Sequence, residues 1–66
     1  MERIEFVKQF EQASRTNDLD VFIRLKDRSV IVARYYILAE QSHVALYSRQ
    51  HEYVGHIALR SIKEML

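Results

Sequence analysis

The sequence has no cysteine, no proline and one glycine in 66 residues. Without cysteine, the chain can form no disulfide, no thiolate nucleophile and no cysteine-based zinc site. A chain of this length lies near the lower limit at which one core suffices for independent folding. Without disulfides or a cysteine-based metal site, its stability must come from core packing and self-association. We therefore expect a single domain over residues 1–66 that forms homo-oligomers.

Long apolar runs are also missing, since no run approaches the ~20 residues that span a bilayer. The first five residues include Glu2 and Glu5, where a signal peptide would be basic and then apolar. The sequence therefore predicts no membrane partner and a cytoplasmic location. Hydrophobic residues make up 48% of the chain, including four tyrosines and three phenylalanines, which predicts a folded rather than a disordered protein.

Motifs that carry catalysis are missing as well. There is no glycine-rich phosphate loop and no His-Glu-x-x-His segment. Of the three histidines, His43 and His51 fall on different predicted elements, and a metal would need them brought together with a further ligand. We therefore expect no enzyme activity, no cofactor and no metal site, with the histidines solvated or partly buried on a sheet.

The N-terminal segment has helical periodicity. Ile4, Val7 and Phe10 recur at a spacing of three residues, with Phe6 beside them and polar residues on the other face. This pattern predicts an amphipathic helix over residues 1–15. The polar residues 15–18 bond readily to their own backbone and should end it.

Beyond residue 20 the period changes to two, because Val21, Ile23 and Leu25 alternate with Phe22 and with basic residues. This alternation favours a half-buried strand, followed by a tight turn at residues 27–29. A helical interpretation stays open, because Leu19, Phe22, Ile23 and Lys26 also fit a helical stripe.

Three further segments are rich in β-forming residues. Residues 30–39 predict a central strand that is apolar on both faces, and residues 43–48 and 53–60 predict two strands joined by a polar turn. Gly55 lies within the last of these strands, where glycine indicates a bulge, a bend or a close backbone approach.

The last segment, residues 61–66, has the Ser-x-x-Glu pattern of a helix cap, so we expect a short helical turn or a last short strand there. Taken together, the segments predict the α+β class. An N-terminal α-helix should be followed, over residues 20–66, by a strongly bent four- to five-stranded antiparallel sheet or a small barrel.

Charge is unevenly distributed along the chain. Residues 1–20 have three basic and five acidic side chains, whereas residues 21–60 have six basic and three acidic ones. Arg24, Lys26 and Arg28 follow one another at every second position, so on a strand they would project from one face and could contact phosphates. The alternative is a solvated outer face. Phe22 shares that face and is the candidate interface residue.

Tyr35, Tyr36, Tyr47 and Tyr53 could stack on unpaired bases, although tyrosine is also common in strands and at least two of the four are expected in the core. The candidate RNA-binding residues are basic or aromatic positions of the predicted sheet: Arg24, Lys26, Arg28, Arg34, Tyr36, His43, Tyr47 and His56.

The segment from Val21 to Asp27 resembles the first strand and the leucine-lysine-aspartate turn of the Sm-like proteins, which include the Sm and Lsm proteins and the bacterial RNA chaperone Hfq. Residues 58–62, Ala-Leu-Arg-Ser-Ile, are similar to the close of Hfq. Arg28 and Ala33 replace two glycines of the family, and Ser42-His43 replaces its methionine-asparagine pair. The resemblance implies a small barrel that assembles into rings and binds single-stranded RNA.

The sequence therefore supports three hypotheses. The first is a non-catalytic, self-associating module that binds single-stranded RNA through a basic, tyrosine-bearing sheet. The second is a protein-interaction or oligomerisation module without a nucleic-acid role, in which the charges serve solubility. The third is a small regulator that blocks another protein.

Overall fold

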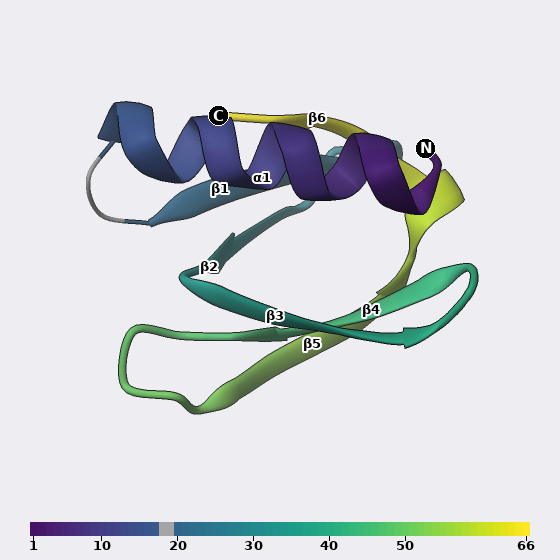
Figure 1. The fold of residues 1–66 in the computed structure, drawn as a ribbon. Helices are drawn as coiled ribbons and strands as arrows, with labels where there is room; N and C mark the ends of the chain where they lie inside the picture. The colour runs from purple at the N-terminus through teal and green to yellow at the C-terminus, as the bar shows by residue number, and fades with distance from the viewer. Residues whose placement is uncertain (18–19) are drawn as a thin grey trace.

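Two three-stranded antiparallel sheets follow one N-terminal helix in the computed structural model, which describes residues 1–17 and 20–66 (Figure 1). Sheet A has the strand order β2-β1-β6, and sheet B has the order β3-β4-β5. The elements are α1 (Arg3–Asn17), β1 (Val21–Leu25), β2 (Val30–Ala33), β3 (Tyr35–Glu40), β4 (His43–Tyr47), β5 (Tyr53–Ala58), the 3₁₀ turn η1 (Leu59–Ser61) and β6 (Ile62–Met65).

The α+β class and the N-terminal helix are confirmed. The finer prediction is not, because the described residues form six strands, and no strand pairing among them joins the two sheets into a closed barrel. At the C-terminal end, the expected last strand is present as β6, and the 3₁₀ turn precedes it. Ser61 does not cap a helix there, because its hydroxyl donates to the Ala58 carbonyl at 2.6 Å.

Strand β1 settles the conformation that the sequence left open. Val21 and Ile23 are fully buried, whereas Phe22 and Arg24 are exposed, which is the alternation of a strand with one face in the core. The helical interpretation is wrong for Val21–Leu25. Leu19, which contributed to that interpretation, and Asp18, expected at the helix end, lie outside the described residues.

The expected central strand over residues 30–39 is wrong. The chain is interrupted at Arg34, so β2 pairs with β1 while β3 pairs with β4. Each of the two strands therefore lies at the end of its own sheet and has a solvated face. Val30 and Val32 on β2, and Tyr35 and Ile37 on β3, are exposed.

The core lies between helix α1 and the inner faces of both sheets. On the helix, Phe6, Phe10 and Ala13 are buried at a spacing of one and two turns. The Phe6 and Phe10 rings meet Tyr36 of β3 edge-to-face, with ring centroids 5.1 and 4.8 Å apart. Burying a large apolar side chain contributes about 1.5–3 kcal/mol, so this aromatic cluster fixes the helix on the sheets.

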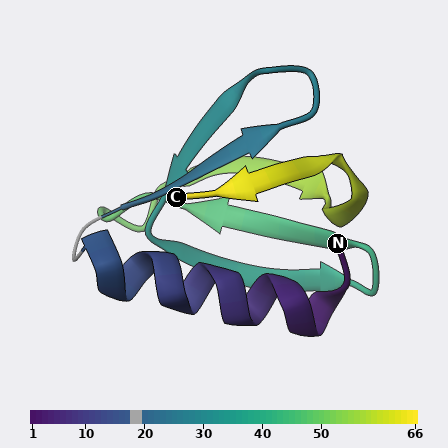
Figure 2. The same cartoon turned by 90° about the horizontal axis from the view of Figure 1, so that it is seen from above.

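Gly55 lies where the two sheets are in close contact. A Cβ atom at this position would lie 3.4 Å from Cδ1 of Ile31 on β2, so β5 of sheet B packs against sheet A here. The pairing of β4 with β5 also shifts between Leu46 and Tyr47, beside Gly55. Both observations confirm the expected close approach and irregularity. Figure 2 shows the resulting arrangement from above.

Candidate nucleic-acid interface

Three tyrosines form a row across the outer face of sheet B. Tyr35 lies opposite Tyr47, and Tyr47 lies opposite Tyr53, so one residue comes from each strand. Their neighbour Leu46 is fully buried, and because side chains alternate along a strand, Tyr47 points the other way. We call Tyr35, Tyr47 and Tyr53 the tyrosine row. Tyr35 is 41% exposed and Tyr53 is 62% exposed, so two aromatic rings are open to solvent.

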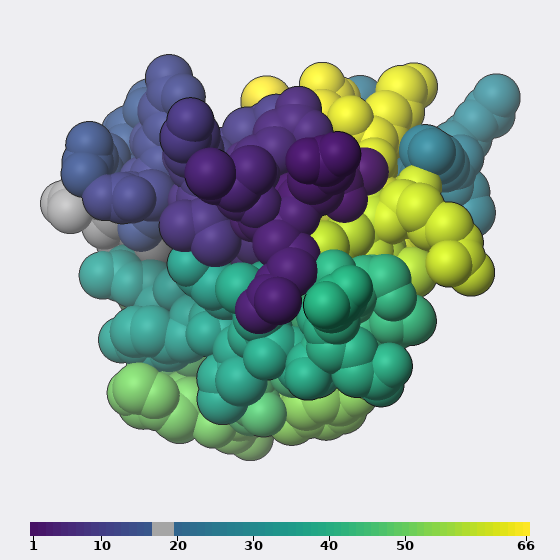
Figure 3. Space-filling model, turned by 45° about the vertical axis from the view of Figure 1, so that its right-hand side comes forward, coloured from purple at the N-terminus to yellow at the C-terminus, as the bar shows by residue number. Residues whose placement is uncertain are grey.

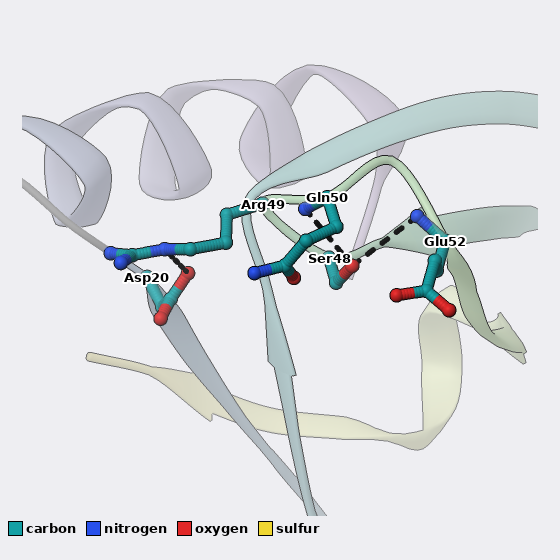
Figure 4. A network of polar contacts seen from close by, with 5 residues as sticks. All are labelled: Asp20, Ser48, Arg49, Gln50 and Glu52. Atoms are coloured by element: carbon teal, nitrogen blue, oxygen red, sulfur yellow. Dashed lines mark hydrogen bonds and ion pairs between the residues drawn. The ribbon is translucent and has the colours of Figure 1, made fainter.

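The loop between β4 and β5 holds a histidine against this row. The Ser48 hydroxyl accepts hydrogen bonds from the backbone N–H groups of Gln50 and Glu52, both at 3.2 Å (Figure 4). His51 has a φ of 64°, a left-handed conformation that costs roughly 1–2 kcal/mol for a residue with a Cβ. In this conformation its imidazole stacks on Tyr35, with ring centroids 4.4 Å apart and an interplanar angle of 9°.

Sheet B has helix α1 on its inner side only. The residues of α1 that reach sheet B contact Tyr36, whose side chain points away from the tyrosine row. In Figure 3 the helix (purple) covers the upper part of the molecule, while the chain of β3–β5 (teal to green) forms the lower part. The outer face of sheet B is therefore left available to a ligand.

The two other histidines also meet on this face. His56 lies opposite Ala45, and His43 lies two residues before Ala45 on β4, so His43 and His56 are diagonal neighbours. Their ring centroids are 5.3 Å apart. Of the eight candidate RNA-binding residues, the structure thus brings His43, Tyr47 and His56 together on the outer face of sheet B.

Tyr36, a candidate stacking residue, lies on the opposite face of β3. It is half-buried, and it packs against Phe6 and Phe10. The expectation that at least two tyrosines pack in the core is wrong, because Tyr36 is the one tyrosine of the four that packs against the buried cluster. Tyr35 and Tyr53 are among the tyrosines that could stack on bases, but they are not among the eight candidate RNA-binding residues, and the sequence offers no reason to include His51.

Arg24, Lys26 and Arg28 do not form the expected stripe on one strand face. Strand β1 ends at Leu25, so Lys26 and Arg28 lie in the turn that follows it. Arg24 forms an ion pair with Glu64 of β6, with a nitrogen–oxygen distance of 2.8 Å. In Figure 2 the β1–β2 turn lies at the top of the view and the β4–β5 loop at its left, so the basic segment is separated from the loop that holds His51.

Two other arginines lie closer to the tyrosine row. Arg34 directly precedes Tyr35, and its backbone N–H donates to the carbonyl of Tyr47 at 2.8 Å. Arg49 lies in the β4–β5 loop, with Nε 3.9 Å from a carboxylate oxygen of Asp20 (Figure 4). The arginines nearest to the row along the chain are thus Arg34 and Arg49, and neither comes from the predicted stripe.

The β1–β2 turn is built around Asp27. The Ser29 hydroxyl and the Ser29 backbone N–H donate to one carboxylate oxygen, at 2.6 and 2.9 Å. These bonds, the hydroxyl first, hold the pKa of Asp27 below its ordinary value of 3.8. The expected tight turn is confirmed, and Arg28 takes the left-handed conformation within it, with a φ of 75°.

The carboxylate of Asp27 should make stability depend on acid pH. Because its pKa is lowered by folding, its contribution is present above the ordinary value of 3.8 and is lost as the pH falls through the folded-state pKa. We expect Asp27→Ala to be less stable than wild type at about pH 7 and more nearly equal to it at about pH 2.5, in urea unfolding. A difference in unfolding free energy that does not change between these pH values would contradict this assignment.

Phe22 lies in an exposed apolar row on the outer face of sheet A. It pairs with Val32 of β2 and exchanges two backbone hydrogen bonds with Leu66, both at 2.9 Å. We call Phe22, Val32 and Leu66 the apolar row. Phe22 is 44% exposed, which confirms the expected exposure, while its role in an interface stays a prediction.

A groove of about 530 Å³ lies between α1 and the C-terminal strand, and it is lined by Gln9, Gln12, Ala13, Thr16, Met65 and Leu66. None of these side chains is a general acid or base. Within residues 1–17 and 20–66, no group of three or more His, Cys, Asp or Glu side chains is placed to hold a metal ion.

Comparisons of the chain with protein-family models, with curated proteins and with solved structures found no match. Among the described residues, no helix is both long enough and apolar enough to cross a membrane.

Proposed function

We propose that this chain is a non-catalytic, self-associating module that binds single-stranded RNA by stacking unpaired bases on the tyrosine row. The observation that carries the proposal is the alignment of Tyr35, Tyr47 and Tyr53 across three strands, on the face of sheet B opposite the helix. Aromatic side chains on a small β surface are a common platform for unpaired bases, because every base presents a π-face.

The dimensions of the row suit a short stretch of bases. Neighbouring strands lie about 4.8 Å apart, so the row spans roughly 10 Å between the outer strands. The exposed rings of Tyr35 and Tyr53 stand at its two ends, and the His51 stack on Tyr35 keeps one of them in a fixed orientation. A platform whose rings are already oriented loses less conformational entropy when a base binds.

Charge contributes less than stacking in this proposal. Arg34 directly precedes Tyr35 and Arg49 follows Tyr47 by two positions, but Arg49 already faces Asp20. Glu52 directly precedes Tyr53, and the formal net charge of the chain is +1. For a single strand, each phosphate that the protein contacts makes the logarithm of the binding constant fall more steeply with the logarithm of the salt concentration, by about 0.7 in the slope. We therefore propose binding with a shallow salt dependence.

We also propose that the chain is related to the Sm-like proteins. This part of the proposal rests on the resemblance of residues 21–27 and 58–62 to that family.

The proposal is tested by fluorescence anisotropy with a labelled single-stranded RNA of about twelve nucleotides and with the same strand in a duplex. The single strand should bind more tightly, because its bases are free to leave the stack and meet the tyrosines. Its affinity should fall only slightly as salt is raised. Equal binding of the duplex, a steep salt dependence or no binding would contradict base stacking on the tyrosine row.

A second candidate function is favoured by the apolar row. Phe22 and Val32 present adjacent exposed apolar side chains on the outer face of sheet A, where a protein or a second copy could pack, and the exposed Leu66 follows β6 next to Phe22. In this alternative the tyrosine row has no ligand. The two functions use the outer faces of different sheets, so a substitution on one outer face removes no residue of the other.

Self-association through the apolar row has a direct test in light scattering after gel filtration. We expect the wild type to have a mass above that of the 7.9 kDa monomer, and Phe22→Ser to lower that mass because it removes apolar surface from the row. Tyr53→Ser is the matched control, since it removes an exposed aromatic ring from sheet B. A wild type that is monomeric at every concentration, or equal effects of both variants, would contradict an interface at Phe22.

A further inference from the structure

The pairing of β4 with β5 brings together two histidines that are thirteen positions apart in the sequence. His43 and His56 lie on the outer face of sheet B, one strand apart, with ring centroids 5.3 Å apart. Each histidine lies opposite an alanine, His43 opposite Ala58 and His56 opposite Ala45. Because alanine side chains end at Cβ, no bulky group from these positions stands between the two rings or covers them.

The separation of the rings matches that of two imidazoles on one metal ion. A tetrahedral zinc ion binds imidazole nitrogen at about 2.0–2.1 Å, which places the centres of two such rings about 5 Å apart. The rings are also accessible, since His56 is exposed and His43 is half-buried. The spacing of the two rings therefore suits two imidazoles that bind one ion.

The surroundings of His43 also favour metal binding. The Ser42 hydroxyl lies 3.0 Å from Nδ1 of His43. A histidine that binds metal through one ring nitrogen usually donates the N–H of the other to a nearby oxygen, which fixes the tautomer and the ring orientation. Here the hydroxyl oxygen can accept from Nδ1–H, the tautomer that leaves the lone pair of Nε2 free. Glu40 lies opposite His43 on β3, so the pair has an acidic residue on the neighbouring strand.

We propose that His43 and His56 form a two-histidine site for a divalent transition-metal ion of the kind that prefers imidazole, such as Zn²⁺ or Cu²⁺. Water fills the remaining coordination positions, since no third His, Cys, Asp or Glu in the described part of the chain completes the group. The inference does not depend on RNA binding, because the tyrosine row is formed by other residues.

The experiment is a calorimetric titration of the full, untagged chain with ZnCl₂ and with CuSO₄. We expect binding of either ion to wild type, tighter for Cu²⁺ than for Zn²⁺ as the general order of affinities requires, and no binding of Mg²⁺, which prefers oxygen ligands. His43→Gln and His56→Gln should each weaken Zn²⁺ binding at least tenfold, because a single imidazole remains. Circular dichroism establishes that each variant is folded.

His51→Gln is the matched control. It removes the third imidazole, which stacks on Tyr35 and is separate from the pair, and it should leave Zn²⁺ affinity unchanged. In NMR spectra of the wild type, Zn²⁺ should shift the ring signals of His43 and His56 and leave those of His51 in place. The proposal is overturned if wild type binds neither ion, if either variant of the pair binds Zn²⁺ as wild type does, or if His51→Gln loses as much affinity as they do.

Discussion

Replacing Phe6 by alanine is expected to lower the free energy of unfolding by about 3–5 kcal/mol, the usual cost of deleting a fully buried aromatic ring. Phe6 is 0% exposed, and its ring contacts both Phe10 of the same helix and Tyr36 of sheet B. The cavity would open where the helix meets the sheets. Since a small domain has a total stability of about 5–15 kcal/mol, this one change removes a large part of it.

Urea unfolding followed by circular dichroism measures this loss. Phe22→Ala is the matched control, because it deletes the same side chain from an exposed position of sheet A and should cost less than about 1 kcal/mol. A loss of stability in Phe6→Ala that is no greater than in Phe22→Ala would show that helix α1 does not depend on this aromatic contact. The position of the helix on the sheets would then need another explanation.

The double variant Tyr35→Ala/Tyr53→Ala is expected to abolish most of the affinity for single-stranded RNA. Each base–aromatic stack contributes about 1–3 kcal/mol, which corresponds to roughly 5- to 150-fold in the dissociation constant for each tyrosine. Both residues are exposed, so the fold should tolerate their removal. Tyr47 is a less suitable choice, because it is half-buried in the central strand of sheet B.

Two controls separate stacking from other effects on RNA binding. Tyr35→Phe/Tyr53→Phe retains both π-faces and should bind RNA nearly as wild type does, whereas loss of affinity there would assign binding to the hydroxyl groups. Phe22→Ala on sheet A should also bind normally. If the double alanine variant kept wild-type affinity in the anisotropy titration, the tyrosine row would not be the RNA site.

The amphipathic helix could be predicted from the sequence, but its buried face could not be predicted fully. The periodicity admitted a stripe that begins at Ile4, and in the structure Ile4 is 66% exposed while Phe6 is fully buried. Phe6, Phe10 and Ala13 recur at spacings of four and three residues, so the buried face shares Phe10 with the expected stripe but includes Phe6 in place of Ile4. Which stripe is buried depends on the sheets beneath the helix, and the helical sequence does not contain that information.

The strand over residues 30–39 was mispredicted for a related reason. Its apolar residues suggested a strand buried on both faces, but the alternation is interrupted at Arg34, where the chain passes from sheet A to sheet B. No glycine or proline marks this point. Val32 and Tyr35 are exposed on the outer faces of two different sheets, which local propensity does not distinguish from burial.

The sequence predicted that tyrosines and histidines of a sheet would form the candidate site, but it identified only some of the residues that do so. Adjacent residues of a strand face opposite sides, so only one of Tyr35 and Tyr36 could face the core, and the sequence alone did not decide which one. Strand register decides it, since Tyr35 pairs with Tyr47 while Tyr36 pairs with the buried Leu46. The proximity of His43 and His56 depends on the same register, so the sequence offered no signal for it.

The pairing of β6 with β1 also affects how the protein folds during its synthesis. Strand β1 is the central strand of sheet A, and one of its two partners is made about forty residues later. A ribosome adds roughly 5–20 residues per second, so for several seconds β1 can pair only with β2. During that time the edge that β6 will cover remains open to other chains. Variants that slow the docking of β6 should therefore aggregate during expression, even where the folded protein is as stable as wild type.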